Sequence, residues 1–187
     1  MRTGEMLVGG CALLVCTGLI FRRVRADYQE FGKLTKTAAY LETMIFFLHG
    51  VSSYAFLDSR LSSLQPRHWT FVLALVLMLA GVAGVLLIMA QLGWGKTVGQ
   101  RVDGLRSSGA YRYSRNPQLI LYFLVVFGYS LLWPSWTGLV WVGLYGFIAH
   151  NMVRVEEAHL SEQYGEAYEI YRHRTPRYIG FPDQDAG

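Results

Sequence analysis

The sequence predicts an all-α integral membrane protein, a bundle of about five transmembrane helices. Three observations lead to this fold class. Hydrophobic residues make up 52% of the 187 residues and charged residues only 16%, and the mean hydropathy of +0.26 is high for a soluble protein of this size. The apolar residues are concentrated in five long runs, and no strand pattern or repeat accompanies them. The ionisable side chains best placed to do chemistry lie in a central loop and in the C-terminal tail.

The first apolar run covers residues 6–21, about 16 residues against the roughly 20 that a bilayer core needs. A cleaved signal peptide carries its positive charges before the run and a small-residue cleavage site after it. Here only Arg2 precedes the run, whereas three arginines follow it closely. We therefore expect a first membrane helix with its N-terminus outside, followed by a polar linker over residues 22–37.

The second run, residues 38–57, is interrupted by Glu42 and His49. Their spacing of seven places them on one face of a helix. Ionisable side chains are costly in lipid, so we expect both to point into the bundle. There they would either form interhelical hydrogen bonds or line a substrate pocket.

The third run, residues 69–92, is the clearest span because it contains no charged residue. Gly81 and Gly84 give it a small-residue face for close helix contact, within the bundle or between copies of the chain. The oligomeric state stays open for this reason.

A hairpin of two shorter runs follows the central loop. Asn116 and Pro117 are typical of a helix N-cap followed by proline at the first helical position, which predicts a fourth helix over residues 117–133. A tight turn at residues 133–136 leads into a fifth run that ends near Ala149. Both helices are short, so we expect a tilted hairpin, a locally thinned bilayer or deeper entry of the chain into the bilayer.

The positive charges indicate the orientation. Segments on one side of the five runs contain three Lys and Arg residues and segments on the other side contain fourteen, which together account for all 17. By the positive-inside rule the fourteen face the cytoplasm, together with the loop, the C-terminus and any site they form. The net charge of +4 then favours anionic lipid headgroups over nucleic acid as a partner. Cys11 and Cys16 match no metal or redox spacing, so no metal site is expected.

The central loop, residues 104–117, combines three kinds of side chain. Its arginines are anion donors, its tyrosines are flat amphipathic surfaces, and its glycines let a ligand approach the backbone. These residues are Arg106, Arg112, Arg115, Tyr111, Tyr113, Gly104 and Gly109. The combination suits a planar, partly charged cofactor such as an adenine nucleoside. Headgroup binding, interfacial anchoring and helix capping explain the same residues without a site.

The tail, residues 154–177, carries a carboxylate and aromatic pattern at helical spacing. One face of a continuous helix would hold Glu157, Leu160, Tyr164, Tyr168 and Tyr171. Arg154 precedes Glu157 by three residues and is positioned to pair with it. An amphipathic helix lying on the headgroups is the alternative.

The two segments together resemble a known family. The loop is similar to the signature SGxYRxxRHPxYxG, and the tail is similar to EExxLxxxFGxxYxxYxxxxPR, in the same order along the chain. These motifs resemble the isoprenylcysteine carboxyl methyltransferase family and its relatives, the phospholipid N-methyltransferases, which are integral membrane enzymes that use S-adenosylmethionine. The resemblance covers about residues 91–179. We expect one membrane domain over residues 1–187, with three spans in 1–92 and the loop, hairpin and tail in 93–187.

The resemblance implies roles for individual residues. The loop and the tail together would form the cofactor site, and Glu157 and Arg154 would be catalytic. The cofactor pocket would be built from Gly109, Tyr111, Arg112, Tyr113, Arg115, Asn116, Pro117, Glu156 and Glu157. Arg174, Glu42 and His49 are candidates for contact with the substrate. Three positions depart from the family pattern, because Asn116 replaces a His, Leu119 a Tyr and Leu121 a Gly.

The function implied is transfer of a methyl group from S-adenosylmethionine to a lipophilic acceptor at the membrane interface. The favoured acceptor is a carboxylate of an isoprenylcysteine-like compound, and a lipid amine, a thiol or a small hydrophobic acid are further options. Two alternatives remain: an NADPH-dependent reductase, because sterol reductases have a similar loop and tail, and a membrane-binding protein without catalysis. Sterol reductases are generally larger and have more helices before the motif.

Overall fold

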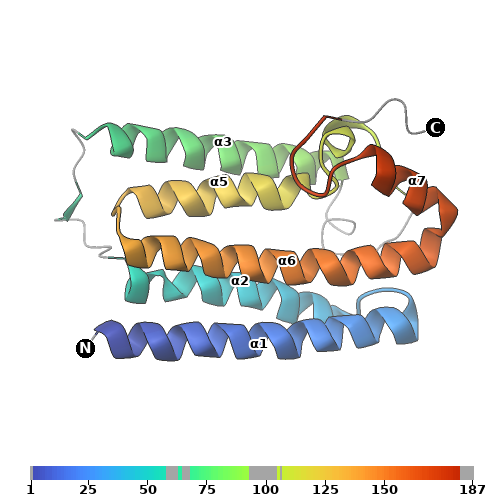
Figure 1. Cartoon of the computed structure of the whole chain (residues 1–187), viewed down its shortest axis with the longest axis horizontal. Coiled ribbons are helices and arrows are strands. Elements are labelled where there is room, and N and C mark those ends of the chain that lie inside the picture. The colour runs from blue at the N-terminus through green and yellow to red at the C-terminus, as the bar shows by residue number, and fades with distance from the viewer. Residues whose placement is uncertain (1, 58–62, 65–67, 93–104, 106, 182–187) are drawn as a thin grey trace.

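The computed structural model describes residues 2–57, 63–64, 68–92, 105 and 107–181, and over these residues it contains helices and no strands. The elements in chain order are α1 (Arg2–Phe31), α2 (Lys36–Phe56), α3 (Trp69–Leu92), the 3-10 turn η2 (Gly109–Arg112), α5 (Pro117–Leu131), α6 (Trp136–Tyr164) and α7 (Glu166–Arg174). The long helices run roughly parallel to one axis, and η2 and α7 lie together at one end (Figure 1). The all-α prediction is therefore confirmed for the described residues.

The exterior of the bundle is apolar along much of its length. Leu7, Val8, Phe47 and Leu79 are all more than 60% exposed, a pattern that suits lipid better than water. Two helical segments, Thr3–Phe31 and Trp69–Gln91, are long and apolar enough to cross a membrane, and Pro117–Leu131 is apolar but shorter. The predicted bundle of about five spans is thus supported for two of them and stays a prediction for the others.

Two helices extend beyond the apolar runs that predicted them. The polar linker expected at residues 22–37 is wrong, because α1 continues to Phe31. Val24 and Asp27 remain on its buried face while Arg22, Arg23 and Arg25 are exposed, so the helix continues to pack after its hydrophobic run ends. In the same way α6 continues from the fifth apolar run into the tail without a break until Gly165, which has a φ of +51°. Only glycine adopts that conformation readily.

Polar side chains fix the starts of α2 and α6. The Thr35 hydroxyl accepts a hydrogen bond from the Ala38 N–H at 3.3 Å, and the Ser135 hydroxyl accepts one from the Gly138 N–H at 3.0 Å. Asp27, which is fully buried, accepts hydrogen bonds from both the backbone N–H and the hydroxyl of Thr35. The turn between α1 and α2 is therefore set by side chains of both helices.

The small-residue face of α3 packs against α5 inside the bundle. A Cβ atom placed on Gly81 would lie 2.5 Å from the carbonyl oxygen of Leu121, and one placed on Gly84 would lie 2.6 Å from the Leu121 side chain. Gly128 of α5 approaches Ala74 of α3 in the same way. Leu121 thus fills space left by two glycines of the neighbouring helix, which accounts for a leucine at this position. Of the two contacts expected for this face, the one within the bundle is observed.

His49 is held between α2 and α6, so it forms an interhelical contact of the kind expected. Its Nε2 lies 2.9 Å from the carbonyl oxygen of Trp141, and the Trp141 indole N–H donates to the His49 carbonyl oxygen at 2.9 Å. The two rings stack with their centroids 4.5 Å apart. This reciprocal pairing gives His49 Nε2 and the Trp141 indole N–H hydrogen-bond partners in the core of the bundle.

Candidate functional site

The end of the central loop is bound to the end of the tail through the backbone. The Arg115 N–H donates to the carbonyl oxygen of Pro176 at 3.0 Å, and the Asn116 side-chain amide donates to the carbonyl oxygen of Arg177 at 2.9 Å. Two consecutive loop residues therefore hold two consecutive tail residues. Segments about 60 residues apart in the sequence are brought together, as the motif pair predicted.

Asn116 does not cap α5 as predicted. It occupies the N-cap position and Pro117 is the first helical residue, but the Asn116 side chain forms no capping hydrogen bond. Its amide is engaged by the carbonyl oxygen of Arg177 instead, and its own backbone N–H donates to the Ser114 hydroxyl at 2.9 Å. Proline at N1 removes one of the N–H groups that a cap would otherwise satisfy, which lowers the need for one.

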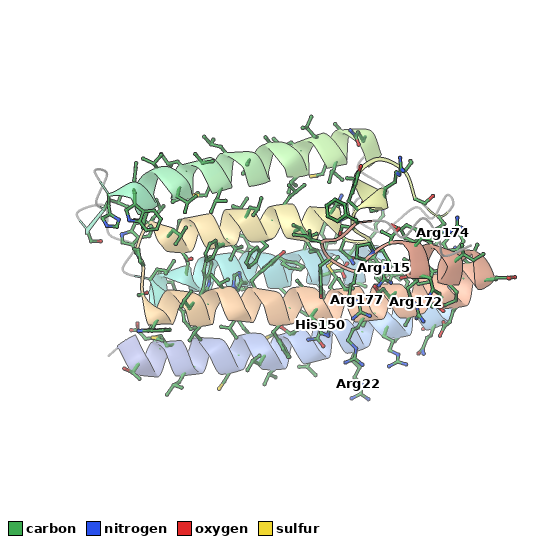
Figure 2. All side chains as sticks on the ribbon, turned by 45° about the horizontal axis from the view of Figure 1, so that its top comes forward. Arg22, Arg115, His150, Arg172, Arg174 and Arg177 are labelled. Atoms are coloured by element: carbon green, nitrogen blue, oxygen red, sulfur yellow. The ribbon has the colours of Figure 1, made fainter. Side chains whose placement is uncertain are left out.

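Glu157 is the charged centre of the region where loop and tail meet. It projects from α6 and is 9% exposed. Its Oε1 lies 2.9 Å from Nη1 of Arg115, and its Oε2 lies 2.7 Å from Nη2 of Arg177. Nε of Arg177 donates to both carboxylate oxygens at 3.1 Å. We call Arg115, Glu157 and Arg177 the Glu157 clamp; Figure 2 shows its two arginines close together where the tail returns to α6.

The clamp carries one negative and two positive charges, and one of its donors is unused. Nε of Arg115 is buried and has no hydrogen-bond partner among the described residues. The hydrogen bonds to Glu157 raise the pKa of the Arg177 guanidinium, so it stays charged throughout the accessible pH range. The clamp is therefore a partly buried cluster with one net positive charge, and its unused N–H donor is of the kind that suits an anion.

Two tyrosines of α7 pack behind the clamp. Tyr168 is 1% exposed, and its hydroxyl accepts a hydrogen bond of 3.4 Å from Nη1 of Arg115. The Tyr171 hydroxyl donates to the carbonyl oxygen of Tyr111 at 2.9 Å, which ties α7 to η2. Burial, with a smaller contribution from Glu157, raises the pKa of Tyr168 to about 12. Burial also raises the pKa of Tyr171, so both phenols stay neutral near pH 7. Their rings pack against the site and their hydroxyls form hydrogen bonds.

The single face predicted for residues 157–171 is interrupted. Gly165 ends α6 and begins α7, so Glu157 lies on one helix while Tyr168 and Tyr171 lie on the next. Arg115 nevertheless contacts both Glu157 and Tyr168, and the ring centroids of Tyr168 and Tyr171 lie 6.2 Å apart. These contacts form because α7 turns back toward the loop (Figure 1).

Arg154 was predicted to pair with Glu157, and this prediction is wrong. Arg154 is exposed, and the ion-pair partners of Glu157 come from the loop and from the end of the tail. Position i−3 on a helix is a neighbour, but two arginines from other segments occupy both carboxylate oxygens. Arg177 was missed as a site residue. The signal was present in the sequence, because Arg177 is the last residue of the tail motif.

The other predicted pocket residues surround the clamp unevenly. Gly109 begins η2 with a φ of +65°, a conformation that favours glycine. Arg112 and Tyr113 follow it and are exposed, and Arg174 is exposed on α7. Of the loop residues named from the sequence, Gly104 and Arg106 lie outside the described residues.

Glu156 faces a different direction from Glu157. It is half-buried and close enough to Glu42 of α2 and Tyr28 of α1 to affect both electrostatically. Burial raises the pKa of the Glu156 carboxyl, and the neighbouring Glu157 raises it further. The ring of Tyr28 also stacks on His159 with centroids 4.0 Å apart. The two glutamates predicted to close one pocket thus belong to two adjacent environments, and Glu42 lies near the second.

A family model described as phospholipid methyltransferase matches residues 69–167, just over half of the chain. The chain belongs to this family. The match begins at the start of α3 and ends within α7, so it contains Arg115 and Glu157 but not Arg177. This phospholipid methyltransferase family consists of membrane-associated enzymes that generally depend on S-adenosylmethionine. No match is found among the curated proteins or among the solved structures.

Proposed function

We propose that the protein transfers the methyl group of S-adenosylmethionine to a lipophilic acceptor at the membrane interface, with the cofactor bound at the Glu157 clamp. The observation that carries this proposal is the clamp itself, which joins the two motifs of a methyltransferase family at one partly buried, charged point. Of the two alternatives, a reductase and a non-catalytic protein, neither is favoured by the family match.

The residues present fit the cofactor by the chemistry of their donors. S-adenosylmethionine has a carboxylate, an amino group, ribose hydroxyls and a planar base. The unpartnered Arg115 Nε and the Arg177 guanidinium suit the carboxylate, and Glu157 suits a hydroxyl or amino donor. Exposed Tyr113, at the end of η2, offers a surface for the base.

The favoured acceptor is the carboxylate of an isoprenylcysteine-like compound. When bound, the cofactor would supply a methyl group on a sulfonium centre, with a carbon–sulfur bond broken for the carbon–oxygen bond formed and the electron pair left on sulfur. A carboxylate is already nucleophilic, so the products are a methyl ester and a neutral thioether, and no base is needed. Arg154 and Arg174 would orient the anionic acceptor, and the protein would contribute mainly by positioning the two reactants.

A phospholipid amine is the second candidate, because the matching family is described as phospholipid methyltransferase. An amine acceptor must lose a proton, which needs a base. Both Glu157 oxygens are already engaged by arginines. The half-buried Glu156 has a raised pKa, so its ionised form would be a stronger base than an ordinary carboxylate. For either acceptor, contact of Glu42 and His49 with the substrate is part of the proposal.

The test is a methyl-transfer assay with radiolabelled S-adenosylmethionine and purified protein in lipid nanodiscs. A farnesylated cysteine analogue and phosphatidylethanolamine are offered separately and in competition. Base-labile methyl ester on the prenylcysteine supports the favoured acceptor, and label in the lipid headgroup supports the second. Binding of NADPH without binding of S-adenosylmethionine or its demethylated product would contradict methyl transfer altogether.

A further inference from the structure

The last described residues form a strap that runs back along the bundle from the Glu157 clamp. We use this name for residues 175–181, which follow α7. Figure 1 shows the chain turning after α7 toward the end of α5 where the central loop lies. Hydrogen bonds from Arg115 and Asn116 fix the strap at its second and third residues, Pro176 and Arg177. Its direction is therefore set by the loop.

The strap reaches toward the apolar part of α6. The Tyr178 hydroxyl lies 3.0 Å from Nδ1 of His150, and His150 directly follows Ala149, where the fifth apolar run ends. Glu157 lies seven residues further along the helix, which corresponds to about 10 Å at 1.5 Å per residue. Between Arg177 and Tyr178 the strap thus passes from the charged site to the level where the hydrophobic surface begins.

Beyond Tyr178 the strap exposes large apolar side chains. Ile179 is 79% exposed and Phe181 is 92% exposed. Side chains of this size are rarely left in water next to one another. The last turn of α7, next to the strap, holds Arg172, His173 and Arg174, all exposed. Arg172 is paired with Glu169 at 2.9 Å, and Arg172 and Arg174 lie with the clamp arginines at the same end of the bundle in Figure 2. Apolar side chains beside basic ones are the composition that binds anionic lipid surfaces.

We propose that residues 178–181 insert into the headgroup region of the adjacent leaflet and anchor the strap to anionic lipid. The strap then forms a wall between the bilayer and the clamp, and its anchoring holds Arg177 against Glu157. A lipophilic acceptor in the leaflet would meet the site beside this wall. The anchoring does not depend on methyl transfer, so its test is independent of the proposed function.

The experiment uses the full chain with Cys11→Ala and Cys16→Ala, which leaves no native cysteine. Single cysteines are introduced as Ile179→Cys, Phe181→Cys and, as a matched control, Ala167→Cys, an exposed position on α7. Each is labelled with an environment-sensitive fluorophore. The proteins are placed at one copy per nanodisc, with or without phosphatidylserine and with lipids that carry a nitroxide near the headgroup.

We expect the labels at 179 and 181 to be quenched at least about threefold more strongly than the label at 167, and more strongly with phosphatidylserine present. Equal quenching at all three positions would overturn the proposal. Absence of quenching together with energy transfer between labels, in nanodiscs that hold two copies, would assign the strap to a protein contact instead. Because Ile179 and Phe181 are both exposed, neither substitution removes a core contact, and thermal unfolding of each labelled protein checks this.

Discussion

At the scale of single residues, Arg154 and Arg177 lie on either side of Glu157 in the sequence, but only Arg177 belongs to the clamp. Arg177 makes three hydrogen bonds to Glu157, whereas Arg154 is exposed. We expect Arg177→Ala to weaken binding of S-adenosylhomocysteine about tenfold and to lower the free energy of unfolding by about 1–2 kcal/mol, since its side chain is partly exposed. Arg154→Ala should change stability by less than about 0.5 kcal/mol.

Calorimetric titration of the two purified variants, with thermal unfolding in the same detergent, makes this comparison. Equal losses of affinity would show that the charge of the region matters and the clamp geometry does not.

A second residue-scale prediction concerns Glu156, whose pKa is raised by burial and by Glu157. The folded protein keeps a proton on Glu156 at pH values where the unfolded chain, with a pKa of about 4.3, has lost it. The folded state then binds more protons, so this carboxyl makes stability fall as the pH rises from about 4.3 to its raised pKa, and the effect levels off above that.

Glu156→Gln removes this dependence. Its unfolding temperature should rise relative to the wild type as the pH increases from about 5 to 8, while Glu30→Gln, at an exposed position of α1, should follow the wild type. Parallel curves for wild type and Glu156→Gln would mean that Glu156 is solvated.

The sequence reveals these residues only in part. The motif pair predicted that Arg115 and Glu157 belong to one site, because Arg115 lies in the loop motif and Glu157 in the tail motif. Their partners could not be assigned, since a helical spacing rule considers only neighbours on the same helix. Arg177 returns to Glu157 after a glycine break and a second helix, and no local pattern predicts that return.

At the scale of elements, the contact between the central loop and the strap depends on Asn116. Its amide is the side-chain donor to the carbonyl oxygen of Arg177. Asn116→Asp replaces that donor with an acceptor. We therefore expect the free energy of unfolding to fall by about 1–3 kcal/mol and trypsin to cleave faster after Arg177. Ser107→Ala, at an exposed loop position, is the control. Unchanged cleavage in Asn116→Asp would show that the Arg115 N–H is sufficient to hold the strap.

The packing of α3 on α5 gives another prediction at this scale. A methyl group on Gly81 would meet the backbone of Leu121, whereas one on Gly84 would meet its side chain. Both Gly→Ala changes should destabilise the protein by about 1–3 kcal/mol. Leu121→Ala should rescue Gly84→Ala but not Gly81→Ala, because only a side chain can be removed.

Denaturation in detergent of the single and double variants tests this pairing. Gly143→Ala is the control, because a methyl group there meets nothing within 4 Å. Rescue of both glycine variants to the same degree would contradict the packing described for Leu121.

The ends of the helices were harder to predict from the sequence than the helices themselves. The third apolar run predicted α3 at its observed bounds, because the whole helix is apolar and contains no charged residue. The ends of α1 and α6 were missed because their buried faces continue with few apolar residues, such as Val24 and Val153, and with polar ones such as Asp27. A run of hydrophobic residues marks contact with lipid, whereas a helix continues wherever one face still packs.

At the scale of the whole molecule, the bundle brings two distant motifs to one end and leaves an apolar exterior along its length. Family membership and the apolar helices place the protein with membrane methyltransferases. The cytoplasmic position of the site remains a prediction from the distribution of Lys and Arg. The central claim is that the place where loop and tail meet binds the methyl donor through Glu157.

Equilibrium binding of S-adenosylhomocysteine to the protein in nanodiscs tests this claim most directly. The comparison is between wild type, Glu157→Gln and Glu166→Gln, the last at an exposed glutamate of α7. We predict saturable binding by wild type and Glu166→Gln, and affinity at least about tenfold weaker for Glu157→Gln, because the clamp loses its central charge. Full affinity in a folded Glu157→Gln variant would contradict the account.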